Sequence, residues 1–183
     1  MNLKRNVQQD NEIKNWLNQI ICGDCLEVMQ GIPDKSVDMI LCDLPYGTTA
    51  CKWDTIIPFE PLWEQYKRLI KSNGAIVLTA SQPFTTSLIA SNMTMFKYCW
   101  VWANHNATGH LTANIPPMLN YEDIAVFGNG SIRYFPQIDK KPVANIRPVS
   151  RRAPTDSYGK YNESADRLIP LGMSFPKRIL NFY

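Results

Sequence analysis

Four consecutive residues, Asp43-Leu44-Pro45-Tyr46, combine an acid, a proline and an aromatic ring in a spacing that could bind a planar amino compound. The Asp43 carboxylate and the backbone carbonyl at Leu44–Pro45 offer two acceptors for the two hydrogens of an exocyclic amino group. The Tyr46 ring could stack on the base that carries this group. Holding both hydrogens in the plane of the acceptors takes the nitrogen lone pair out of conjugation. These four residues therefore predict a site that prepares an amino nitrogen to attack an electrophilic methyl group.

The strand that must position these residues directly precedes them. Residues 37–42 are mostly apolar, which is typical of a parallel strand covered on both faces. Open α/β sheets bind ligands at the carboxyl ends of such strands. Pro45 fixes its own φ at about −65°, and Leu44 before it is restricted to extended backbone. We therefore expect the carboxylate and the ring to project from the strand end in a fixed arrangement.

Strand and helix patterns alternate along the rest of the chain. Residues 25–31, 61–71 and 82–92 have helical patterns, and we expect strands over 19–22, 75–80, 96–102 and 121–127. Asn129-Gly130 is a strong hairpin signal, so the last of these strands is expected to pair with 131–135. The order predicts an α/β fold, mostly parallel with an antiparallel hairpin edge.

The motif resembles the D-P-P-Y signature of the amino-methyltransferases that modify adenine N6 or cytosine N4 in DNA, with Leu44 as the departure from its commonest form. Residues 21–38 are similar to the segment that precedes the catalytic strand in the β-type order of this family. Residues 46–54 and 96–102, with Ala107-Thr108-Gly109, resemble its phage-like branch. The resemblance runs from about residue 20 to the last residue and is most specific over 20–130.

This resemblance implies a Rossmann-like methyltransferase sheet and S-adenosylmethionine-dependent methyl transfer. The expected substrate is a base flipped out of double-stranded DNA, with adenine N6 favoured over cytosine N4. The resemblance assigns catalysis to the D-P-P-Y-like motif, Asp43, Leu44, Pro45 and Tyr46. It assigns cofactor contacts to Asp24, Cys25 and Asp43. Asp24 is also a good N-cap for a helix that starts at Cys25, and both roles can hold together.

Charge divides the chain unevenly. Residues 1–130 carry 9 Lys/Arg and 12 Asp/Glu, whereas residues 131–183 carry 10 and 4, so the last part is strongly basic. We expect an N-terminal arm over 1–18, a catalytic core over 19–130, and over 131–183 a basic target-recognition region with the start of a truncated carboxyl-terminal part. A solvated tail would explain the same charge. The expected DNA contacts are the basic residues Lys140, Lys141, Arg147, Arg151 and Arg152, and the resemblance adds Thr108.

The five cysteines form an odd set, and the sequence has neither a signal peptide nor a long apolar run. A reduced cytoplasmic protein without a membrane partner is therefore expected. Cys22 and Cys25 form a C-x-x-C, which could be half a zinc site or a redox pair. No second pair follows at zinc-finger spacing, so we expect no metal.

No F-x-G-x-G sequence occurs in the 183 residues. The resemblance therefore implies a methyltransferase without its principal methionine-binding loop, and a sheet that is incomplete with an exposed edge near the carboxyl terminus. The chain could be a truncated product, a fragment, or a piece that a second chain completes.

Three functional hypotheses follow. The first is a DNA amino-methyltransferase, and the second is a catalytically silent, DNA-binding remnant of one. They differ in whether the chain binds S-adenosylmethionine. The third is a C-x-x-C redox protein, which would require a cysteine of lowered pKa.

Overall fold

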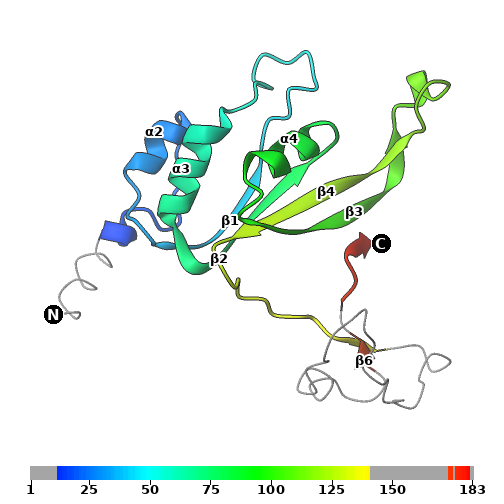
Figure 1. Cartoon of the computed structure of the whole chain (residues 1–183). Helices are drawn as coiled ribbons and strands as arrows, with labels where there is room; N and C mark the ends of the chain where they lie inside the picture. The colour runs from blue at the N-terminus through cyan, green and yellow to red at the C-terminus, as the bar shows by residue number, and fades with distance from the viewer. Residues whose placement is uncertain (1–11, 141–172, 175, 182–183) are drawn as a thin grey trace. The chain divides into compact units, whose positions relative to one another are not determined.

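Residues 12–140, 173–174 and 176–181 are described by a computed structural model, drawn in colour in Figure 1. The chain divides into two units. One comprises Met1–Arg133 with Arg178–Tyr183, and the other comprises Tyr134–Lys177. In the described part of the second unit, β5 (Asp139–Lys140) pairs antiparallel with β6 (Met173–Ser174).

The first unit contains a five-stranded sheet in the order β1-β2-β4-β3-β7. Its strands are β1 (Val37–Asp43), β2 (Ile70–Ala80), β3 (Phe96–Thr108), β4 (Leu119–Gly128) and β7 (Ile179–Asn181). β1 runs parallel to β2 and β7 parallel to β3, whereas β4 is antiparallel to both of its neighbours. The predicted α/β class is confirmed, with parallel and antiparallel strands in one sheet (Figure 1).

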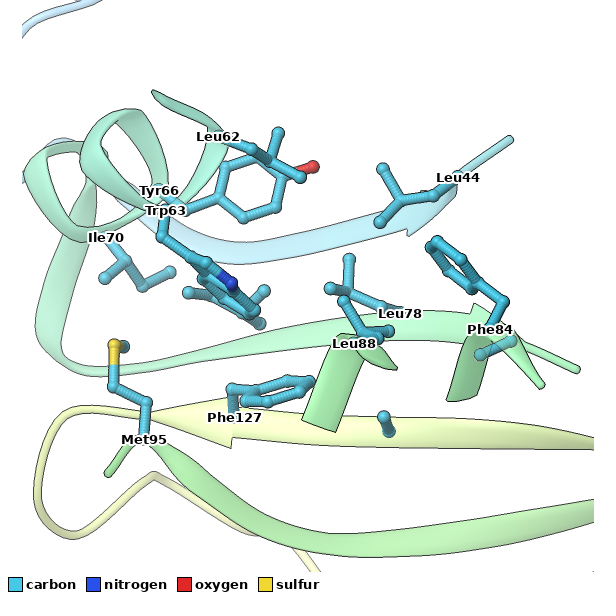
Figure 2. Close-up of a cluster of buried hydrophobic side chains, with 13 residues drawn as sticks. Leu44, Leu62, Trp63, Tyr66, Ile70, Leu78, Phe84, Leu88, Met95 and Phe127 are labelled. Carbon is cyan, nitrogen blue, oxygen red and sulfur yellow. The ribbon is translucent and has the colours of Figure 1, made fainter. Parts of the chain in front are cut away.

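Helices pack against one face of this sheet in the described part of the chain. α3 (Phe59–Leu69) buries Leu62, Trp63 and Tyr66, whose three- and four-residue spacing places them on one side of the helix. α4 (Phe84–Ser91) contributes Phe84 and Leu88. Figure 2 shows these side chains pointing toward the strands, where they form a core. The buried members on the sheet include Ile70, Ile76, Leu78, Ala80, Ala125 and Phe127.

The opposite face of β1 is open in the described part of the chain, contrary to the expectation of a strand covered on both sides. Met39 is 55% exposed and Leu41 66% exposed. Their partners on β2, Ala75 and Val77, are only half-buried, whereas Ile76 and Leu78 on the helix-covered face are fully buried. An apolar strand pattern predicts that a strand belongs in a sheet, but it does not specify what covers each face.

Two predicted elements differ from the structure: one is not a strand, and the other extends past a local turn signal because of backbone pairing. α2 (Cys25–Gln30) agrees with the expected helix, but residues 19–22 are not a strand, and Ile20 is fully exposed. β2 starts at Ile70 and runs through Asn73-Gly74, which we expected to end the preceding helix. A Cβ on Gly74 would lie 2.7 Å from the Asp38 carbonyl oxygen, so glycine permits the close approach of β1 and β2 there.

The predicted hairpin between 121–127 and 131–135 is wrong. β4 pairs instead with β3 and β2, and residues 131–135 form no strand. The chain turns at Gly130, whose φ is +73°, and the Arg133 N–H then donates to the Asn73 carbonyl at 3.0 Å. The strand expected over 96–102 is longer than predicted, since β3 continues to Thr108, and a short 3-10 turn, η1 (His110–Thr112), follows it.

Candidate functional site

Asp43 is the last residue of β1 and lies exposed at the carboxyl end of this parallel strand. The parallel register pairs it directly with Thr79 on β2. Because residues paired across neighbouring strands share a face, both side chains emerge on the side of the sheet opposite α3 and α4. This is the sheet edge at which open α/β sheets bind ligands.

Three oxygen atoms cluster at this position. The Tyr46 hydroxyl donates to Asp43 Oδ1 at 2.7 Å, and the Thr79 hydroxyl donates to the same oxygen. The Tyr46 and Thr79 hydroxyl oxygens lie 3.0 Å apart. Both donors therefore act on Oδ1, and neither engages Oδ2.

The Tyr46 ring is held by packing as well as by this hydrogen bond. It stacks on Phe84 with a centroid distance of 5.2 Å and an interplanar angle of 25°. The Phe84 ring in turn packs near the Phe59 ring, with a centroid distance of 5.7 Å. Burial, followed by the nearby Asp43 carboxylate, raises the Tyr46 pKa far above its usual value. The phenol therefore keeps its proton at neutral pH and remains a hydrogen-bond donor.

Leu44 and Pro45 connect the acid to the ring. Leu44 is 5% exposed and packs in the core close to Phe84, as Figure 2 shows. With its side chain buried, Leu44 can offer a ligand only its backbone. This burial fixes the strand end from which Asp43 projects.

Asp54 organises the loop that follows Tyr46, and the sequence analysis gave it no role. Its carboxylate accepts the backbone N–H groups of Gly47, Thr48 and Thr49 at 2.8, 2.9 and 2.7 Å. These hydrogen bonds lower the Asp54 pKa to about 2. Gly47 has a φ of +68°, a conformation that favours glycine. In the sequence, Tyr46-Gly47 indicates a turn at the start of this loop. It does not indicate which carboxylate the N–H groups of the loop bind.

Asp24 caps α2 through its Oδ1, which accepts the Leu26 N–H at 2.8 Å. The predicted N-cap role is thus present, and it leaves Asp24 exposed. The pKa of Cys25, the first residue of α2, is raised by burial, by Asp24 and by Cys42, the neighbour of Asp43 on β1. The start of α2 therefore lies near the strand end that carries the D-P-P-Y-like motif.

Two of the six expected DNA contacts, Thr108 and Lys140, lie within the described residues. Thr108 ends β3 and is exposed, with its hydroxyl donating to the Leu119 carbonyl at 3.4 Å. Lys140 is exposed on β5 in the other unit. Lys141, Arg147, Arg151 and Arg152 lie outside the described residues.

The cysteines give no support to redox chemistry. All five thiols are free. Burial and the neighbouring Asp24 raise the Cys25 pKa, the opposite of what a reactive thiol needs. In the described ranges, no group of three or more His, Cys, Asp or Glu residues could hold a metal ion. None of the helices described there is long and apolar enough to span a membrane.

Comparison with known proteins gives partial similarities. No family model matches the chain. The type II methyltransferase M.HinfI of Haemophilus influenzae is 30% identical over 92 residues, which cover 38% of this chain and 26% of that protein. The match thus spans about a quarter of the relative's length.

Two solved methyltransferase structures have weaker likenesses. M1.HpyAVI, solved as a complex with SAM, is 18% identical, with a TM-score of 0.48 over 62% of this chain and 56% of that one. The cytosine-N4-specific PvuII DNA methyltransferase is 11% identical, with a TM-score of 0.49 over 87% of this chain and 55% of that one.

Proposed function

We propose that this chain takes part in S-adenosylmethionine-dependent DNA methyl transfer, and that its residues bind and orient the exocyclic amino group of a flipped base. One observation carries the proposal. Asp43 stands at the carboxyl end of β1 with Oδ1 held by two hydroxyls, directly before Leu44 and Pro45. The similarity to M.HinfI adds support from sequence.

The Asp43 carboxylate accepts one amino hydrogen and the Leu44 carbonyl accepts the other. This pairing localises the lone pair on nitrogen and places a negative charge beside the positive charge that develops there. After the transfer, the nitrogen returns to neutrality by losing one proton to solvent water, which reaches the exposed Asp43. Asp43 therefore acts by orientation and charge stabilisation and need not be a strong base.

The Tyr46 ring supplies the stacking surface. Phe84 packs against one face of this ring, and the base stacks on the other. Base flipping costs a few kcal/mol, and aromatic stacking returns about 1–3 kcal/mol. A hydrogen bond to the charged Asp43 adds about 1.5–3 kcal/mol. These contributions together are comparable with the flipping cost. Adenine is our preferred target, on the resemblance to the phage-like branch.

Asp24 and Cys25 are the residues we assign to the cofactor, together with Asp43. Their fit rests on the chemistry of the donor set and on position. Asp24 Oδ1 is used by the N-cap, which leaves Oδ2 as an acceptor for a ribose hydroxyl or an adenine amino group. When bound, S-adenosylmethionine supplies the electrophilic methyl group. Asp24 directly precedes Cys25, whose raised pKa reflects burial, Asp24 and also Cys42, the neighbour of Asp43.

The remaining assignments follow the division of charge. We propose residues 19–130 as the catalytic core and 1–18 as an N-terminal arm. Residues 131–183 are proposed as the target-recognition region together with the start of a carboxyl-terminal part, whose β7 belongs to the five-stranded sheet. The basic residues of 131–183, together with Thr108, contact DNA phosphates and fix the register of the protein on the duplex. A cytoplasmic location follows from the DNA substrate and the five free thiols.

We further propose that a second polypeptide segment completes the site. β1 is an outer strand of the described sheet, and its open face carries the exposed Met39 and Leu41. Strands of parallel sheets are ordinarily covered on both faces and paired on both sides. A segment that pairs with β1 would bring a glycine-rich loop next to Asp43. The alternative is a silent DNA-binding remnant, which would not bind the cofactor.

Calorimetric titration of S-adenosylmethionine into the chain separates these proposals. We expect binding that weakens about ten- to a hundredfold in Asp24→Ala, because a hydrogen bond to a charged group is lost. Asp24→Ser is the matched control, since serine retains the N-cap but cannot reach as far. If Asp24→Ser bound S-adenosylmethionine with wild-type affinity, Asp24 would act only as the N-cap of α2. A folded chain that binds no cofactor, alone or with an added F-x-G-x-G-containing polypeptide, would favour the remnant.

A further inference from the structure

Thr79 lies at the proposed site, although no motif in the sequence includes it. It is the next-to-last residue of β2, and the register of β1 and β2 pairs it with Asp43. Its hydroxyl donates to Asp43 Oδ1 and lies 3.0 Å from the Tyr46 hydroxyl oxygen. One side chain thus connects the acid and the aromatic residue of the D-P-P-Y-like motif through a strand 36 positions further along the chain.

The rigidity of its surroundings makes Thr79 an effective anchor. β2 is a central strand with β1 on one side and β4 on the other. Ala80 next to Thr79 is fully buried, and Leu78 on its other side is fully buried as well. A β-branched residue on such a strand has few χ1 choices, so its hydroxyl has a fixed direction. Asp43 by contrast is exposed at a strand end, where a carboxylate unheld by partners would rotate.

The number of hydrogen-bond acceptor positions on the Asp43 carboxylate also favours this arrangement. A carboxylate has two oxygens and about four acceptor positions. Two hydroxyls converge on Oδ1, so an amino group from a ligand finds the more available acceptor at Oδ2. The choice of oxygen fixes the plane in which the amino hydrogens are drawn.

We infer that Thr79 is a positioning residue that locks the Asp43 carboxylate, through Oδ1, so that Oδ2 receives the amino group of the target base. The inference rests on the proposed function, which it deepens. Thr79 contacts neither base nor cofactor and acts through Asp43 and Tyr46. Its loss should therefore reduce the rate of transfer and leave the binding of DNA almost unchanged.

The test compares Thr79→Val with Thr79→Ser. Valine keeps the β-branched shape and removes the hydroxyl, whereas serine keeps the hydroxyl. With unmethylated genomic DNA and radiolabelled S-adenosylmethionine, we expect kcat about ten- to a hundredfold lower in Thr79→Val, an unchanged KM for DNA, and recovery in Thr79→Ser. The control is Thr86→Val, which removes a hydroxyl bonded to the neutral Gln82 side chain and should leave kcat unchanged.

Equal kcat in wild type and Thr79→Val would overturn the inference, as would a rise in KM with kcat unchanged. Failure of Thr79→Ser to recover activity would also contradict it. A wild type that transfers no methyl group, either alone or with the added F-x-G-x-G-containing polypeptide, refutes the proposed function instead. In that case, the free energy of unfolding in denaturant tests whether Thr79 and Asp43 are in contact. Thr79→Val should destabilise the wild type and have no further effect in an Asp43→Ala background, and equal destabilisation in both backgrounds would show that no such contact exists.

Discussion

Three backbone N–H groups converge on the Asp54 carboxylate and hold the loop that begins at Gly47. This loop follows Tyr46 directly, so its order limits the movement of the Tyr46 ring. Asp54 is buried, and within the described residues its charge is balanced by these N–H groups. The acid thereby supports the site from a distance of several residues.

The stability of this loop should depend on pH in a defined direction. The Asp54 pKa is about 2 in the folded state, below the usual value of an aspartate. A carboxyl with a lowered folded-state pKa stabilises the fold above its unfolded pKa and loses this contribution as the pH falls through the folded one. The free energy of unfolding should therefore contain an Asp54 contribution that declines between about pH 4 and pH 2.

Denaturant unfolding of wild type and Asp54→Asn at several pH values measures this contribution. We expect the variant to be less stable at pH 7, with the difference shrinking below about pH 4. Asp38→Asn serves as the control, because Asp38 is exposed and its ion pair with Lys71 contributes little. A difference between wild type and Asp54→Asn that stays constant down to pH 2 would contradict the assignment.

At the scale of elements, the sequence predicts the individual helices and strands better than their pairing. The periodicity of α3 and the apolar runs of β1 and β2 are local properties, and all three elements were predicted. The partner of β4 was not, because Asn129-Gly130 is a local signal that competes with long-range pairing to β3 and β2. Residues 19–22 show the same limit, since an apolar pair alone does not bring a segment into the sheet.

The candidate site divides in the same way. Asp43, Leu44, Pro45 and Tyr46 are contiguous, so their chemistry could be predicted from their order. Thr79 and Phe84 reach Tyr46 only through the register of β2 and the position of α4. Neither a parallel register nor a helix position can be obtained from a motif.

The open face of β1 leads to a prediction about association. Met39 and Leu41 present an apolar surface on an outer strand, a combination that favours self-association. We expect Leu41→Lys to lower the apparent mass in light scattering at high protein concentration. Leu111→Lys is the matched control, because Leu111 is 89% exposed but lies in η1, away from this face. Monodisperse monomers for wild type, or equal effects of the two variants, would argue against a face that needs a cover.

At the scale of the whole molecule, the chain separates an acidic part from a basic one. Residues 1–130 carry a net charge of −3 and residues 131–183 a net charge of +6. Phosphate binding requires concentrated positive charge, whereas a site for a developing cation requires a negative one. The two proposed tasks, holding DNA and orienting an amino group, are thus assigned to parts of opposite charge. The affinity for DNA should accordingly fall as the salt concentration rises.

The central claim is that Asp43 orients an amino group for methyl transfer. The most direct measurement is transfer of radiolabelled methyl groups from S-adenosylmethionine to unmethylated genomic DNA, by wild type and Asp43→Ala, with a polypeptide carrying the glycine-rich loop added if needed. We predict transfer by the wild type and a loss of at least about a hundredfold in Asp43→Ala, with normal activity in the exposed control Asp38→Ala. Equal transfer by wild type and Asp43→Ala, or none by the wild type under either condition, would contradict this account.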